Sequence, residues 1–292
     1  MITEPGCYQM TLAEYLADPC PEPSLSSHLA DILLRQSPLH AKLAHPRLNP
    51  HLARDTSAAF DLGTAVHQLV LEGDERFCVI EAPDYKKPVT RKYRADARDA
   101  GQIPILIAQM ATVRAMAWSI HLQLEVFPDP KPLRAGKPER VLIWREGAIW
   151  CRARLDWLHD DHRTVDDLKT TSESAHPAEW SRHLFDRGGD LQAAFHTRGV
   201  QQVFGALPDF RFLVVETDLP YAVSLIGLDP EALAFGQTRM LRAIELWARS
   251  QRTGQWPGYP RRPVYASVPP WILTRWQESR YYEEVTDDPR GA

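Results

Sequence analysis

The chain has 292 residues, of which 44% are hydrophobic, and a formal net charge of −4. This length and hydrophobic content are sufficient for one large α/β domain with a sizeable core. No run approaches 18 consecutive apolar residues, and the N-terminus lacks a basic start followed by an apolar run, so we expect neither a membrane span nor an export signal. Because the net charge is negative, any nucleic-acid binding must come from a local basic surface.

Cysteine usage and the missing nucleotide and hydrolase motifs exclude further classes. The four cysteines are scattered without a C-x2-C pair, which argues against a zinc ribbon and fits reduced thiols in a cytoplasm. The sequence has neither a G-x-x-x-x-G-K-[ST] loop nor a G-x-S-x-G elbow, so nothing indicates an NTPase or a serine hydrolase.

The first part of the chain predicts a surface segment followed by helices. Residues 1–23 are proline-containing with little periodicity, and we expect them to run over the surface. Ser24 to Ser27 is typical of a helix N-cap leading into residues 28–36. Residues 58–72 carry apolar side chains at three- and four-residue steps, which predicts an amphipathic helix.

Within that helix, Gly63 lies one turn before His67 on the same face. A mid-helix glycine costs about 1 kcal/mol relative to alanine, so it suggests close approach of another backbone. His67 has two interpretations at this stage: a neutral imidazole metal ligand, or a core or interface histidine.

The segment from residue 85 to 98 contains six basic residues and two tyrosines. It is either a solvated loop or a mobile segment that grips phosphates and stacks on an end base, with Arg91, Lys92 and Arg94 as candidate DNA contacts. It follows a short strand over residues 77–82, and residues 103–127 predict one long helix.

Three consecutive antiparallel strands are predicted over residues 139–145, 149–158 and 164–170. Side chains alternate faces along a strand, so Asp167 and Lys169 point the same way.

The hairpin joining the last two strands turns near Asp161, which brings Asp156 beside Asp167 and Lys169. Two carboxylates and an ammonium are costly to bury together unless a divalent cation lies between the carboxylates. Oxygen ligands suit Mg²⁺ or Mn²⁺, which can activate water for phosphodiester hydrolysis, and the lysine can offset developing charge. An exposed hairpin with a weak surface ion pair is the alternative.

The rest of the chain predicts helices over 177–185, 190–204 and 231–251, and strands over 210–219 and 221–228. Gln192 and His196 lie one turn apart and can together face a nucleotide or a metal-bound water. Residues 256–276 are rich in Pro, Trp and Tyr and are expected to pack back, whereas residues 287–292 are expected to be disordered.

Four motifs in this order resemble the PD-(D/E)xK nuclease superfamily, and most closely the RecE (exonuclease VIII)-type exonucleases of phages and prophages in its RecB-like branch. The motifs are Gly63-x3-His67, Arg154-x-Asp156, Asp167-x-Lys169-Thr170-Thr171 and Gln192-x3-His196. The resemblance covers residues 24–272.

The resemblance implies that His67, Asp156 and Asp167 bind Mg²⁺, or Mn²⁺ in its place, together with the backbone carbonyl of Leu168. Lys169 is the implied catalytic lysine.

Asp156, Asp167 and Gln192 complete the implied catalytic set. Glu139 stands where an acidic residue is frequent on a core strand, and we interpret it as a supporting residue and not a ligand. His196 replaces the usual tyrosine, although it can still stack or hydrogen-bond. The branch members with an iron–sulfur cluster carry cysteines after the core, and this chain has none after Cys151.

The implied fold is α/β: a PD-(D/E)xK restriction-endonuclease-like core with a mixed central β-sheet flanked by helices. We expect one nuclease domain over residues 24–276 with an aromatic-rich tail, preceded by the surface segment 1–23 and followed by a partly disordered tail over 277–292.

The implied activity is Mg²⁺-dependent 5′→3′ digestion of linear double-stranded DNA from its ends, leaving 3′ single-stranded tails. The implied partner is a RecT-like single-strand annealing protein, in the cytoplasm of a bacterial or phage-infected cell. A homo-oligomeric ring, as a tetramer, is also implied. Two alternatives stay open: a nuclease of the same fold acting on single strands or particular structures, and a non-catalytic DNA-binding module.

Overall fold

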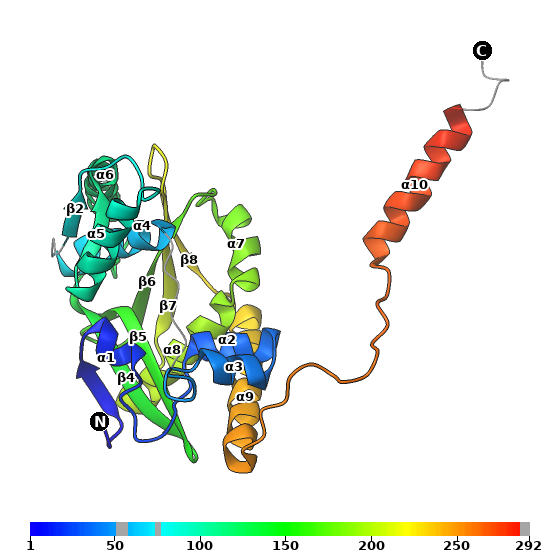
Figure 1. The fold of residues 1–292 in the computed structure, drawn as a ribbon, viewed down its shortest axis with the longest axis horizontal. Coiled ribbons are helices and arrows are strands. Elements are labelled where there is room, and N and C mark those ends of the chain that lie inside the picture. Colours follow the sequence, from blue (N-terminus) through cyan, green and yellow to red (C-terminus); the bar gives the residue numbers. More distant parts are fainter. Residues whose placement is uncertain (51–57, 74–76, 287–292) are drawn as a thin grey trace. The chain divides into compact units, whose positions relative to one another are not determined.

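The protein is represented by a computed structural model that describes residues 1–50, 58–73 and 77–286 (Figure 1). It divides into two units, Met1–Gly258 and Tyr259–Ala292. The second unit contains α10 (Pro270–Thr286), and the expected disorder at residues 287–292 lies outside the described residues. The domain boundaries expected from the sequence stay a prediction.

The first unit is built on a six-stranded sheet whose strand order is β1-β4-β5-β6-β7-β8. The strands are β1 (Gly6–Gln9), β4 (Gly136–Glu146), β5 (Ile149–His159), β6 (Thr164–Thr171), β7 (Asp209–Glu216) and β8 (Val223–Gly227). All neighbours are antiparallel except β6 and β7, which are parallel. A parallel pair needs a long crossover, and here it contains α7 (Pro177–Asp186) and α8 (Gly189–Phe204). The predicted α/β class with a mixed, helix-flanked sheet is confirmed.

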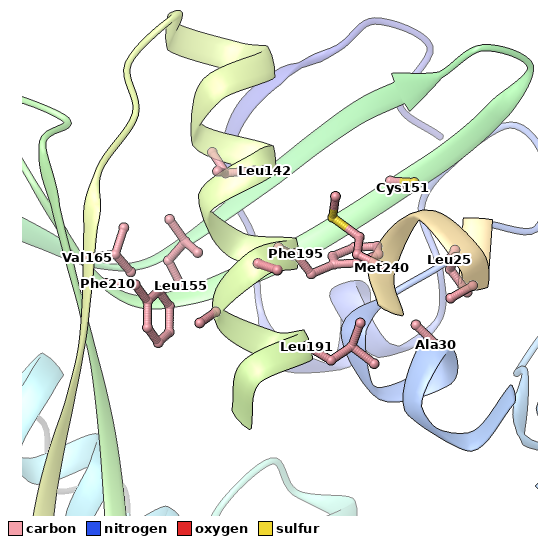
Figure 2. Close-up of a cluster of buried hydrophobic side chains, with 14 of the residues drawn as sticks. Leu25, Ala30, Leu142, Cys151, Leu155, Val165, Leu191, Phe195, Phe210 and Met240 are labelled. Atoms are coloured by element: carbon pink, nitrogen blue, oxygen red, sulfur yellow. The ribbon is translucent and has the colours of Figure 1, made fainter. Parts of the chain in front are cut away.

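Helices cover both faces of this sheet because its central strands are apolar on both faces. On β7, Phe212 and Val214 belong to one core cluster, whereas Leu213 and Val215 belong to another. Figure 2 shows the first cluster, in which Phe195 of α8 lies among side chains from the strands.

Each core cluster has its own set of helices. The helices of the first cluster are α2 (Ser27–Arg35), α3 (Pro38–Ala44), α7, α8 and α9 (Pro230–Thr253). Those of the second are α4 (Ala58–His67), the π-helix η1 (Gln68–Glu72) and α6 (Ile107–Leu124). Figure 1 shows α2, α3 and α9 grouped together, apart from α4 and α6. The N-cap predicted for the first helix is confirmed, because the Ser26 side chain accepts from the Leu29 amide.

The N-terminal segment is more ordered than its composition predicts. Its residues 6–9 form β1, which pairs with residues 140–143 of β4, and α1 (Leu12–Leu16) follows with a capping box at Thr11. β1 has only four residues, which is too few for an alternating pattern to be recognised in the sequence, and the strand with which it pairs lies more than a hundred residues away.

A second, two-stranded parallel sheet joins β2 (Phe77–Ile80) and β3 (Ile103–Leu106) through α5 (Pro88–Asp99). The prediction of a loop or mobile segment over 85–98 is therefore wrong, because Pro88 starts a helix rich in helix-forming Ala, Arg and Lys. The prediction of one helix from residue 103 is also wrong at its start, since residues 103–106 pair with β2 before α6 begins. No described helix is long and apolar enough to cross a membrane.

Candidate active site

The candidate active site lies where β5 and β6 separate. Next to their hairpin these strands pair through Trp157 with Asp166 and Leu158 with Val165. Two residues beyond Asp166, the Leu168 amide donates a 2.8 Å hydrogen bond to the side chain of Asp156, the residue before Trp157. A carboxylate therefore occupies the gap between two central strands, where it can be reached from α4.

Three potential metal ligands converge at this gap. One ligand atom each of His67, Glu139 and Asp156 lies within 4.8 Å of the other two, and His67 Nδ1 is 3.7 Å from Asp156 Oδ2. All three residues are partly exposed. Two carboxylates and an imidazole suit a divalent cation such as Mg²⁺ or Mn²⁺, so the donor set fits the implied metal.

Glu139 reaches this group through an unusual backbone conformation. Its φ angle is +57°, in the left-handed region that costs a non-glycine residue about 1–3 kcal/mol, and it interrupts the pairing of β4 with β5. The Arg154 guanidinium lies 2.5 Å from Glu139 Oε2. Burial raises the pKa of Glu139 to about 8, Arg154 opposes this, and the charges of Asp156 and Glu72 add to it. The structure therefore places Glu139 among the possible ligands, beyond the supporting position predicted for it.

Asp167 belongs to a second group beside the first. Its two carboxylate oxygens lie 2.6 Å from Lys169 Nζ and 2.8 Å from Gln192 Nε2, which donates to it. Asp167 is buried, whereas Lys169 keeps a third of its side chain exposed. Burial lowers the pKa of Lys169, but the carboxylates of Asp167 and Asp156 outweigh it and raise the pKa, so Lys169 is charged at neutral pH. A partly exposed, charged ammonium therefore lies beside the Asp167 carboxylate.

His67 ends α4 and directly precedes η1, a π-helix of the kind that often accompanies functional sites. Burial and the Lys169 charge lower the pKa of His67 to about 4, so its ring is neutral at pH 7 and available to bind a metal. A Cβ on Gly63 would lie 3.3 Å from Oγ1 of Thr170. The close approach expected at Gly63 therefore involves a side chain of β6 and not a backbone.

The other residues predicted from the sequence lie around this centre. The Leu168 amide binds Asp156, and a hydrogen bond between Leu168 and His67 raises the pKa of His67, which places the Leu168 backbone at the site. His196 is only 3% exposed and packs edge-on against Phe210, and burial lowers its pKa to about 4. This burial disfavours a DNA contact by His196.

The three basic candidates lie on α5, and their described contacts are local. Lys92 pairs with Asp96 at 2.7 Å, and the Arg94 guanidinium lies 4.6 Å from the centre of the Tyr85 ring. Arg91 is exposed. None of the described contacts of these three residues involves the potential metal ligands, and DNA binding by this helix stays a prediction.

Arg154 is the residue of this site to which the sequence analysis gave no role. It lies two positions before Asp156 on the same face of β5, so strand alternation could have placed it beside the carboxylates. Its partner Glu139 could not be inferred that way, because a regular strand does not predict a left-handed residue.

A mixed sheet with carboxylates at a strand gap, a lysine two residues further along β6 and a histidine on a crossing helix is the arrangement of a PD-(D/E)xK-type domain. Residues 33–263 match the family model described as "PDDEXK-like domain of unknown function (DUF3799)". The chain belongs to this family. A search of curated protein sequences gave no match.

A solved structure shares this fold. A protein from Eubacterium rectale that is provisionally named an exonuclease is similar with a TM-score of 0.56 and 13% identity, over 91% of this chain and 98% of that chain. A second structure, of SSO0001, aligns over 82% of this chain and 88% of that chain at 10% identity, with a TM-score of 0.27. The superfamily predicted from the motifs is confirmed, and the RecE-type specificity stays a prediction.

Proposed function

We propose that this protein is a metal-dependent deoxyribonuclease that digests linear double-stranded DNA from 5′ ends and leaves 3′ single-stranded tails. The observation that carries the nuclease chemistry is the joint position of two groups at one strand gap: His67, Glu139 and Asp156 as ligands, and Lys169 on Asp167 beside them. The family match and the shared fold with the Eubacterium rectale protein that is provisionally named an exonuclease support this proposal.

The side chains divide the work between binding and positioning. His67, Glu139 and Asp156 would hold the divalent cation, which supplies a polarised phosphoryl oxygen and an activated water. The charged Lys169 offsets negative charge that develops on the phosphate, and Asp167 fixes its ammonium at 2.6 Å. Gln192 holds the other Asp167 oxygen and so keeps that carboxylate oriented toward the lysine.

The strand polarity, the preference for duplex ends, the RecT-like annealing partner and the ring-shaped tetramer rest on the motif resemblance. We include these four features in the proposal on the strength of that resemblance. The acidic net charge agrees with a ring, because only the surface facing the DNA then needs to be basic.

The test is a digestion of linear duplex DNA labelled at its 5′ or 3′ end, with a closed circular duplex beside it and Mg²⁺ or Mn²⁺ present. We expect the wild type to release the 5′ label as mononucleotide and to spare the circle. Lys169→Ala should lower the rate at least about 100-fold, because an electrostatic group acting on the transition state is lost. Lys131→Ala is the matched control, since Lys131 is equally exposed and ion-paired, but with Glu125.

The outcomes separate the parts of the proposal. Cutting of the circle would retain the chemistry and reject the exonuclease. Release of the 3′ label first would reverse the polarity. Absence of cleavage with either metal, or an unchanged rate in Lys169→Ala, would reject the catalytic assignment and favour a DNA-binding module.

A further inference from the structure

Helix α6 has an apolar face that its own fold leaves exposed. Val113, Met116, Ile120 and Leu124 are buried in the second core cluster. A separate row of apolar side chains follows α6 and the turn after it, and all of its members are exposed. This row, the α6 stripe, consists of Ile107, Ala111, Ala115, Trp118, Leu122 and Val126.

The α6 stripe is one continuous face. At about 100° per residue, its six positions fall within an arc of roughly 100°, and the centre of that arc is opposite the buried face. Ala108 and Glu125 lie at the two edges of the same arc, and the antiparallel register described below places them opposite each other. Trp118 is 65% exposed, Leu122 52% and Val126 82%, so the face is not a graded edge of the core. Rows of exposed apolar side chains that gather on one face are candidates for interaction sites in soluble proteins.

The spacing along the stripe indicates what covers it. The successive steps are four, four, three, four and four residues, the same in both directions. A second α6 laid antiparallel about the midpoint therefore meets the first in register: Ile107 opposite Val126, Ala111 opposite Leu122, and Ala115 opposite Trp118. A two-fold interface requires this property, because one surface must be complementary to itself.

Side-chain size is complementary in the same register. The alanines lie in the N-terminal half of the stripe and the largest side chains, Trp118 and Leu122, lie in the C-terminal half. Antiparallel pairing places each large side chain against an alanine of the other copy, which is how facing helices fill space without voids. Parallel pairing would place tryptophan on tryptophan and alanine on alanine.

We infer that the α6 stripe is the interface with a second copy of this chain, formed by two α6 helices packed antiparallel about a two-fold axis near residues 116 and 117. Trp118 is its anchor, since tryptophans in small pockets dominate interface energies. This interface does not depend on nuclease activity. An isologous pair closes as a dimer. A ring-shaped tetramer can contain it only if a second, different isologous interface joins two such dimers, since a ring with one repeated interface is heterologous.

The experiment measures the mass of the full-length protein by light scattering after size exclusion, from about 1 to 100 µM, a range in which an interface with a micromolar Kd dissociates on dilution. We expect wild type to be a dimer or an even multiple of it, and Leu122→Glu to weaken association at least about 100-fold. Leu241→Glu on α9 is the matched control, since Leu241 is 58% exposed, and it should leave the mass unchanged. Thermal unfolding checks that both variants fold.

Two results would overturn the inference. One is a wild type that stays monomeric across this concentration range. In that case, a lower Tm for the Leu122→Glu monomer than for the wild-type monomer would mean that another segment of the same chain covers the α6 stripe. The other is an assembly that Leu122→Glu leaves intact.

Cross-linking tests the antiparallel register. With Cys7 and Cys78 changed to serine, Ala115→Cys in two copies would be offset by about 4.5 Å along the axis, whereas Ile107→Cys would be offset by about 28 Å. A short bismaleimide should therefore join copies through residue 115 and not through residue 107. Equal cross-linking at both positions would indicate parallel helices and refute the register.

Discussion

Asp18→Asn removes the centre of a buried ionic cluster that ties the N-terminal segment to β5. The Asp18 side chain has no exposed surface, accepts from the amide and hydroxyl of Ser24, and lies 3.1 Å from His45 Nε2 and 3.2 Å from the Arg152 guanidinium. Burial by itself would raise the pKa of Asp18, but His45, Arg152 and Ser24 outweigh it and lower the pKa to about 2. The charged carboxylate therefore stabilises the fold.

The magnitude follows from that pKa. The fall from 3.8 to about 2, at about 1.4 kcal/mol for each pKa unit, corresponds to about 2 kcal/mol of unfolding free energy. Because the folded pKa of Asp18 is the lower one, this contribution is complete above about pH 5 and is lost as the pH falls through 2. Roughly half of it remains at pH 3. Asp18→Asn also leaves the buried Arg152 without its carboxylate, so we expect a total cost of about 3 kcal/mol or more at pH 6.

The assay is urea unfolding of wild type and Asp18→Asn at pH 6 and pH 3. The difference in unfolding free energy should shrink by about 1 kcal/mol at pH 3, because the wild type has by then lost half of the Asp18 contribution. Glu125→Gln is the control: Lys131 and Arg134 lower the pKa of Glu125 to about 2 as well, but its side chain is 48% exposed, so its loss should cost far less. A difference for Asp18→Asn that is the same at both pH values would refute the reasoning.

Two further outcomes are expected. Because the pKa of Glu139 is raised to about 8 without metal, Mn²⁺ binding at pH 7 should displace about one proton from the protein. Calorimetry in two buffers of different ionisation enthalpy measures this proton release, and Glu139→Gln should abolish it. Equal proton release by the wild type and Glu139→Gln would show that Glu139 is not a ligand. Gly236→Ala places a Cβ against the backbone carbonyl of Asp190 where α8 and α9 cross, so it should lower the unfolding free energy by about 2 kcal/mol. Helix propensity alone would instead stabilise Gly236→Ala by up to about 1 kcal/mol, and a gain in urea unfolding would contradict the tight crossing.

Much of the fold was predictable wherever a signal is local. The Ser26 N-cap, the β5–β6 hairpin and the alternation along β6 depend on neighbouring residues, so the sequence alone predicted α2, both strands and the common face of Asp167 and Lys169. The helix of His67 followed from its three- and four-residue apolar steps. Fold class was accessible for the same reason.

Only the tertiary structure decided the features that depend on distant partners. β1 is a strand because β4 pairs with it, and α6 starts at Ile107 because residues 103–106 add to β2. Glu139 lies beside His67 at a position of β4 where the backbone is left-handed. This conformation costs a non-glycine residue free energy that contacts elsewhere in the fold must offset, so local propensity does not predict it. Local conformation depends on neighbouring residues and can be predicted from the sequence. The site depends on contacts between residues far apart in the sequence, and these contacts form only in the folded protein.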